Sequence, residues 1–129
     1  MPMSLSSKNI HSVENAILAA KQKKIYPEAL LQKIIENECY LVCDGNVLRA
    51  KELMLPLCVE INSKKYVCAF TNKEWADQYL NETSAIVKLS AIEALRNIPQ
   101  DYGIIINPNH DASVKFEYSG IQNILRDFG

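Results

Sequence analysis

The sequence predicts an α+β domain, in which helices pack on a mixed sheet in the order ααβββαβαββα. Two helical stripes near the N-terminus, short apolar strands after them, and three capping motifs at strand-to-helix junctions lead to this fold class. With 129 residues and 48% hydrophobic side chains, the chain suits one domain with a real core. Residues 1–9 are small and polar, so we expect a flexible tail before a single domain over residues 10–129.

The first two elements form a predicted helical hairpin. The first helix begins at the capping residue Ser12 and ends near Lys23. Its apolar stripe consists of Val13, Ala16, Ile17 and Ala20. Pro27 suits the first turn of the second helix, where its missing N–H would be unpaired in any case. The stripe of this helix consists of Leu30, Leu31, Ile34 and Ile35, and the link over residues 24–26 is short enough for a hairpin.

The hydrophobic period then changes to that of strands. Residues 39–43, 53–61 and 66–70 read as three strands, and the turn residues 62–65 join the last two. Because Pro56 cannot donate to a ladder, we place it near the start of its strand or at a sheet edge. These segments predict a three-strand antiparallel meander.

A strand end and a helix start meet at residues 70–75. Thr71 is the expected N-cap, and Glu74 three residues later completes a capping box. Phe70 and Trp75 hold the two positions of a hydrophobic staple. The third helix then carries Trp75, Ala76, Tyr79 and Leu80 on one side.

The rest of the chain alternates strands and helices that complete the mixed sheet. Residues 85–89 predict a strand, and Ser90 opens a second capping box and a helix. The continuous apolar run 102–106 predicts a strand buried on both faces at the sheet centre. Residues 114–117 predict a last strand, and Ser119 opens a third capping box. The final helix places Ile121, Ile124, Leu125 and Phe128 on one side.

Composition narrows the classes of partner. Lys and Arg total 14 against 15 Asp and Glu, so the net charge is −1. A nucleic acid or an anionic membrane demands a concentrated basic face, so we expect neither as a partner. Lys21, Lys23 and Lys24 form the nearest approach to one, and their place at a helix end accounts for them. No signal pattern opens the chain, and its longest apolar run is far shorter than a membrane span, so we expect a soluble cytoplasmic protein.

The four cysteines favour core thiols. Cys39, Cys43, Cys58 and Cys68 all fall inside apolar strand patterns, where a free thiol acts as a small hydrophobe. Cys39 and Cys43 have a loose zinc spacing without a second pair. A three-residue turn at residues 62–64 would place Cys58 and Cys68 opposite one another, whereas a two-residue turn would place them on opposite faces. A metal site and a redox pair therefore stay open as alternatives.

No pattern of catalytic, cofactor-binding or metal-ligating residues stands out. His11 and His110 are both expected in solvent, and the four glycines do not form a phosphate loop. We therefore predict no catalytic residue, cofactor or metal. Trp75 and Tyr79 are the candidate partner-binding face, because tryptophan and tyrosine are favoured at interfaces, although the staple position of Trp75 favours packing.

Several short motifs carry a family resemblance in their order and spacing. They are Glu14-Asn15, Pro27, Leu30-Leu31, Glu38-Cys39-Tyr40-Leu41-Val42, Leu55-Pro56-Leu57, Phe70-Thr71-Asn72-Lys73-Glu74 and Ile104-Ile105-Ile106-Asn107-Pro108. Together with a closing helix, they make residues 9–128 resemble the N-terminal domain of the SseB family (enhanced serine sensitivity). The resemblance implies an α/β domain in a bacterial cytoplasmic protein, with no established catalytic residue.

The expected function is that of a non-enzymatic protein-interaction or adaptor domain. The reason is that the sequence predicts a hydrophobic core large enough for a stable domain but no group of side chains arranged for catalysis. Two alternatives come from other classes: an immunity or antitoxin-like protein made beside a toxic effector, and a thiol-based redox enzyme that uses Cys58 and Cys68.

Overall fold

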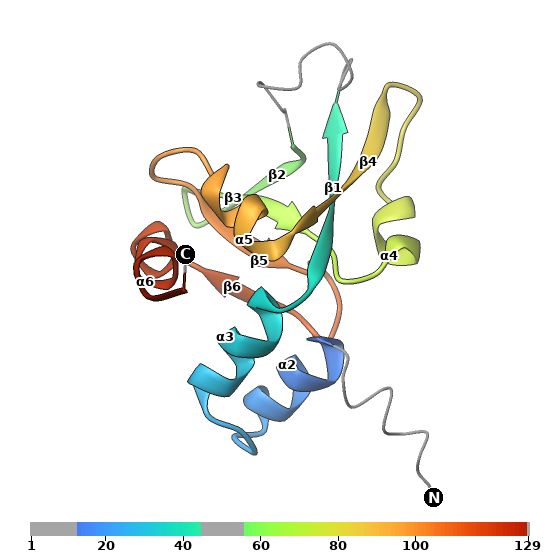
Figure 1. The fold of residues 1–129 in the computed structure, drawn as a ribbon. Helices are drawn as coiled ribbons and strands as arrows, with labels where there is room; N and C mark the ends of the chain where they lie inside the picture. The colour runs from blue at the N-terminus through green and yellow to red at the C-terminus, as the bar shows by residue number, and fades with distance from the viewer. Residues whose placement is uncertain (1–12, 45–55, 129) are drawn as a thin grey trace, which may run out of the picture.

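The computed structural model describes residues 13–44 and 56–128. The predicted tail, the Ser12 cap, His11 and the first part of the strand predicted at 53–61 lie outside these residues. The described elements are α2 (Val13–Lys21), α3 (Pro27–Ile35), β1 (Glu38–Asp44), β2 (Cys58–Ile61), β3 (Lys64–Ala69), α4 (Lys73–Asp77), β4 (Ser84–Ser90), α5 (Ala91–Arg96), β5 (Gly103–Ile106), β6 (Val114–Phe116) and α6 (Tyr118–Phe128). Their order confirms the predicted α+β succession (Figure 1).

A four-stranded mixed sheet forms the centre of the domain, with the strand order β2-β3-β5-β6. β3 and β5 run parallel, starting with Tyr66 beside Gly103, and the two outer pairs are antiparallel. All four residues of β5 are buried, which confirms the central strand predicted from the apolar run. Gly103 is required here, because a Cβ at this position would lie 2.4 Å from the Phe116 carbonyl oxygen.

The predicted meander is wrong in one pairing. β1 forms its ladder with β4, over seven residue pairs from Glu38↔Ser90 to Asp44↔Ser84, and not with β2. In the described part of the chain, its backbone meets the larger sheet at the isolated bridges Tyr40↔Phe70 and Cys43↔Pro56. β1 and β4 are both seven residues long, so every residue of each has a partner in this ladder, whereas β2 offers only four residues.

The β2–β3 hairpin has a two-residue turn. Asn62 and Ser63 lie between the paired residues Ile61 and Lys64, and both have positive φ, 53° and 69°. Two positive φ values are typical of a type I′ turn, which matches the twist of the flanking strands. The turn therefore selects the register in which Cys58 and Cys68 point to opposite faces.

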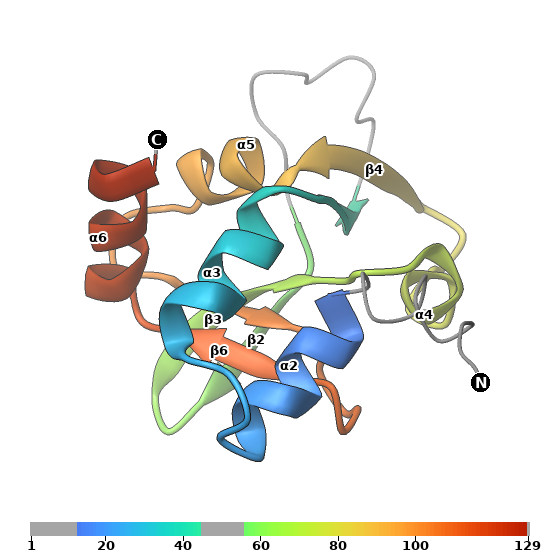
Figure 2. The ribbon, with the colours of Figure 1, turned by 60° about the horizontal axis from the view of Figure 1, so that its bottom comes forward.

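Both faces of the larger sheet are covered. The helices α2, α3, α5 and α6 contribute to one hydrophobic cluster with alternate residues of β3 and β5, including Ala69 and Ile106. The other face packs around Tyr66, Cys68 and Phe70, with Ala76 from α4. Figure 2 shows the α2–α3 hairpin in front of the sheet, with α6 and α4 at its two ends.

Of the three helix N-caps predicted at strand-to-helix junctions, one is confirmed and two are wrong. The Ser90 hydroxyl accepts from the backbone N–H of Glu93 at 3.1 Å, as predicted. At the α4 junction the N-cap is Asn72, one residue after the predicted Thr71, and its side chain accepts from the backbone N–H of Trp75 at 2.9 Å. α6 begins at Tyr118, so Ser119 lies inside its first turn and is not the cap.

The predicted third helix is also shorter than its apolar pattern suggested. α4 ends at Asp77, so Tyr79 and Leu80 follow the helix instead of lying on its face. The cap shift moves the staple positions as well, because Phe70 no longer directly precedes the N-cap. Phe70 is fully buried and its ring packs against that of Tyr79, with 5.0 Å between the ring centroids.

Candidate functional site

Among the described residues, Asn107 is the one buried polar or charged residue. It is fully buried, directly after β5, in a left-handed conformation with φ 58° that asparagine tolerates. Its Oδ1 accepts from the backbone N–H of Thr71 at 3.0 Å. Its Nδ2 donates to the Thr71 hydroxyl and to the carbonyl oxygen of Ala112, each at 2.9 Å. Asn107 therefore joins the end of β5 to the segment after β3.

The same network continues to the first helix. The Thr71 hydroxyl donates to the Glu14 carboxylate, which also accepts from Asn72 Nδ2 at 3.2 Å. Glu14, Thr71, Asn72 and Asn107 come from three distant parts of the chain, and together they fasten α2 to the edge of the central strands. Buried polar groups need partners, and every polar side-chain atom found buried in the described residues has one.

Trp75 and Tyr79, the predicted partner-binding pair, are both half-buried and lie against the loop after β5. The Trp75 ring stacks on the His110 ring, with 3.9 Å between centroids and 11° between planes. The Tyr79 hydroxyl donates to the Pro108 carbonyl at 3.3 Å and accepts from Asn109 Nδ2 at 3.0 Å. His110 was predicted in solvent, but it is half-buried because this stacking covers one face of its ring.

The four cysteines differ in exposure. Cys39, Cys43 and Cys68 are buried and only Cys58 is exposed, and all four are free thiols. Burial raises the pKa of Cys39 to about 12, that of Cys43 to about 11 and that of Cys68 to about 12. Burial also raises the pKa of Cys58. Because the thiolate is the reactive form, these shifts make each thiol a weaker nucleophile near neutral pH.

One ionisable pair lies at the start of α6. The Tyr66 hydroxyl donates to Glu117 at 2.6 Å, and Lys64 lies 3.4 Å from the same carboxylate. The hydrogen bond from Tyr66 lowers the pKa of Glu117 and, in return, raises that of Tyr66. The pair fixes the entry into the last helix. Among residues 13–44 and 56–128, no group of three or more His, Cys, Asp or Glu side chains is placed to hold a metal ion.

The described residues line several open concavities, one of about 230 Å³ beside α6 and two that are larger. The larger, of about 630 Å³, lies between the α2–α3 hairpin and β6, and we call it the hairpin groove. Its lining is Ile17, Ala20, Lys21, Lys23, Ile25, Tyr26, Pro27, Leu30, Val114 and Phe116. The smaller, of about 320 Å³, is lined by Val42, Pro56, Leu57, Cys58, Tyr79, Asn81 and Ser84, and we call it the Tyr79 hollow.

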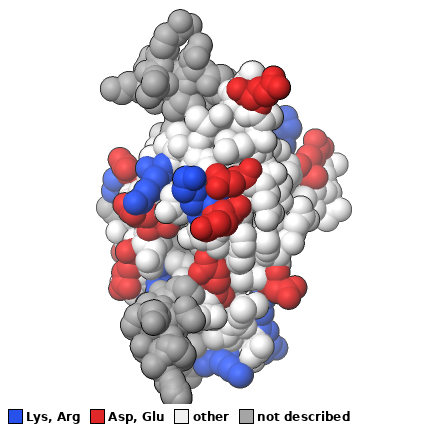
Figure 3. All heavy atoms as spheres, turned by 90° about the vertical axis from the view of Figure 1, so that its right-hand side faces the viewer, with Lys and Arg blue, Asp and Glu red and all other residues white. Residues whose placement is uncertain are grey.

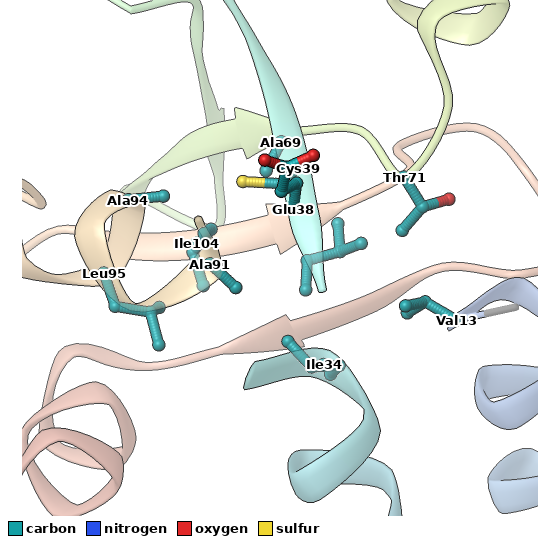
Figure 4. A pocket seen from close by; sticks show the side chains of 11 residues that line it. Val13, Ile34, Glu38, Cys39, Ala69, Thr71, Ala91, Ala94, Leu95 and Ile104 are labelled. Carbon is teal, nitrogen blue, oxygen red and sulfur yellow. The ribbon is translucent and has the colours of Figure 1, made fainter. Parts of the chain in front are cut away.

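A further space lies inside the core and is too small for a ligand. It measures about 20 Å³ and is enclosed by side chains from α3, β1, α5 and β5, among them Ile34, Cys39, Leu95 and Ile104 (Figure 4). A space of this size holds one water molecule at most. We therefore treat it as a packing feature and not as a binding site.

The surface charge is mixed on the side of the molecule that Figure 3 shows. Acidic and basic side chains alternate over this side without a large patch of one sign. In the described part of the chain, no helix is long and apolar enough to cross a membrane.

A comparison of the sequence with known protein families finds a match. The SseB protein N-terminal domain matches residues 13–123. The chain belongs to the SseB N-terminal domain family. No curated protein and no solved structure matches it.

Three of the motifs that suggested the SseB family meet in the polar network. Glu14 comes from the first motif, Thr71 and Asn72 from the third strand's end, and Asn107 from the Asn-Pro pair. Sequence reasoning placed Thr71 at a helix cap and missed the convergence of these four residues. The signal available was that Thr71, Asn72 and Asn107 are short polar residues that follow the apolar strands ending at residues 70 and 106.

Proposed function

We propose that this SseB domain is a non-enzymatic protein-interaction or adaptor module. The observation that carries the proposal is the hairpin groove, an open and largely apolar concavity of about 630 Å³. Tyr26 at its border is 80% exposed, an unusual position for a large aromatic side chain. Apolar concave surfaces of this kind mark places where a soluble domain meets a partner.

The chemistry of the polar residues supports binding over catalysis. Thr71 is hydrogen-bonded to both Glu14 and Asn107, so these side chains are engaged within the fold. A thiol enzyme that used Cys58 and Cys68 would need two thiols that meet, and these two lie on opposite faces of the hairpin. An adaptor needs neither a general base nor an activated nucleophile.

The face that carries Trp75 and Tyr79 is a second place where a partner can bind. Tyr79 lines the Tyr79 hollow together with Pro56 and Cys58. The hollow therefore joins the predicted partner-binding residue Tyr79 to the segment around Pro56.

The test is affinity capture from the native host with the whole chain as bait. Each of two variants places a bulky charged side chain in one concavity. Ala20→Arg does so in the hairpin groove, and Cys58→Arg does so in the Tyr79 hollow. Gln122→Arg, on the exposed side of α6, is the matched control. We expect one reproducible partner that the control retains and that one of the two variants loses.

Recovery of no reproducible partner, or of a partner that both variants retain, contradicts the proposal. An immunity protein is a special case of such a module. For that case the prey is the product of the neighbouring gene, and the same three variants apply.

A further inference from the structure

The hairpin groove has two walls of different kinds. Ile17, Ala20 and Leu30 form the helical wall, and Val114 and Phe116 of β6 form the other. The two β6 residues alternate with Lys115, which points to the opposite face and lies 5.4 Å from the Tyr66 ring. One wall of the groove is therefore the apolar face of a strand.

That strand is the outermost of its sheet. β6 pairs with β5 through Ile104↔Phe116, Ile105↔Lys115 and Ile106↔Val114, and it is the last strand in the order of the described sheet. An edge strand presents backbone N–H and C=O groups that an extended segment can pair with. Alternate side chains of such a segment would then enter the hairpin groove.

The charges at the groove are of one sign. Lys21 and Lys23 belong to its lining, and none of the described lining residues is acidic. Lys21 donates to the backbone carbonyl of Asp111 at 2.9 Å, so its charge has no carboxylate partner there. Across residues 13–44 and 56–128, neither of these lysines, nor the adjacent Lys24, takes part in an ion pair. Unpaired positive charge beside an apolar groove complements an acidic ligand.

We propose that the hairpin groove binds an extended acidic segment of a partner protein, which adds to the edge of β6. Its apolar side chains, at alternate positions, occupy the groove, and its carboxylates face Lys21 and Lys23. This proposal rests on the interaction role proposed above and specifies the chemistry of the partner. The chain's own residues 1–12 do not fit this description, because they contain no acidic residue and include Lys8.

The test uses the whole chain and two short fluorescent peptides of equal length. In one peptide valine alternates with glutamate, and in the other valine alternates with lysine. Fluorescence anisotropy measures the dissociation constant of each at low and at moderate salt. The test variant is the double charge reversal Lys21→Glu with Lys23→Glu. The control, Lys88→Glu on β4, makes the same type of change at an exposed residue that does not line the groove.

We expect the glutamate peptide to bind and the lysine peptide not to bind. The double reversal weakens binding by about tenfold, since each change replaces an attraction with a repulsion, while the control leaves it unchanged. Added salt weakens binding to the natural chain. Far-ultraviolet circular dichroism of each variant verifies that the fold is kept.

Equal binding of both peptides, no binding of either, or a dissociation constant that the double reversal does not change overturns the proposal. Self-association that Tyr26→Ser abolishes also overturns it, because a second copy would then be the occupant. A host partner that Cys58→Arg loses and Ala20→Arg retains leaves the interaction role standing and refutes this groove as its site.

Discussion

Replacing Asn107 by alanine removes the centre of the polar network. The change deletes the acceptor of the Thr71 backbone N–H and the donor to the Ala112 carbonyl. It also leaves alanine at φ 58°, in the left-handed region.

The magnitude follows from these two losses. A buried polar group left without a partner costs about 1–3 kcal/mol, and two such groups are created. Alanine in the left-handed region adds about 1 kcal/mol. We therefore expect Asn107→Ala to lower the free energy of unfolding by about 4 kcal/mol, a large share of the roughly 5–15 kcal/mol typical of a domain.

Urea denaturation followed by circular dichroism measures this loss. Asn123→Ala, at an exposed position of α6, is the control and is expected to change the free energy of unfolding by less than about 0.5 kcal/mol. Thr71→Val removes the hydroxyl that accepts from Asn107, so the double variant is expected to show a coupling above about 0.5 kcal/mol. A loss below about 1 kcal/mol for Asn107→Ala, or strict additivity with Thr71→Val, would refute the reasoning.

Three further predictions concern packing, acid stability and thiols. Gly103→Ala lowers the free energy of unfolding by at least about 2 kcal/mol, because its Cβ would meet a backbone oxygen at 2.4 Å. The control Gly120→Ala in α6, where the nearest atom to the new Cβ lies at 4.0 Å, is neutral or stabilising by about 0.5–1 kcal/mol. Urea denaturation measures both, and equal losses for the two variants would contradict this. Because the folded-state pKa of Glu117 is lowered, its contribution to stability is present above the unfolded-state pKa and is lost as pH falls through the folded-state pKa. Glu117→Gln therefore makes the free energy of unfolding fall less steeply as the pH is lowered. An unchanged fall in this variant contradicts the hydrogen bond from Tyr66. A short iodoacetamide pulse read by mass spectrometry labels Cys58 in the native protein, and labels the three buried cysteines only after unfolding; rapid native labelling of a second thiol would contradict the burial.

The local elements were predictable because each carries its own periodic or turn signal. Pro27 does lie in the first turn of α3, the Ser90 cap is made, and the apolar run before Asn107 is the buried central strand. These features depend on residues within one turn or one strand of each other. The family resemblance was confirmed for the same reason, since its motifs are short and keep their order.

The misplaced features depend on contacts between distant residues. Thr71 and Asn72 are both good capping residues. Asn72 caps α4, because the Thr71 hydroxyl accepts a hydrogen bond from Asn107, 36 residues away. The pairing of β1 with β4 joins residues that are 40 to 52 positions apart, from Asp44↔Ser84 to Glu38↔Ser90. No local pattern distinguishes β4 from β2 as the neighbour of β1. The hairpin groove was not foreseen, because it exists only where α2, α3 and β6 meet.

The two long-range strand pairings interlock along the chain. β1 pairs with β4 and β3 pairs with β5, so that β3 falls between the members of the first pair and β4 between those of the second. A fragment that stops before β4 leaves β1 without its ladder, and a fragment that starts after β1 leaves β4 without one. Splitting this polypeptide into two autonomous pieces is therefore expected to fail, and the described region is expected to melt in a single all-or-none step.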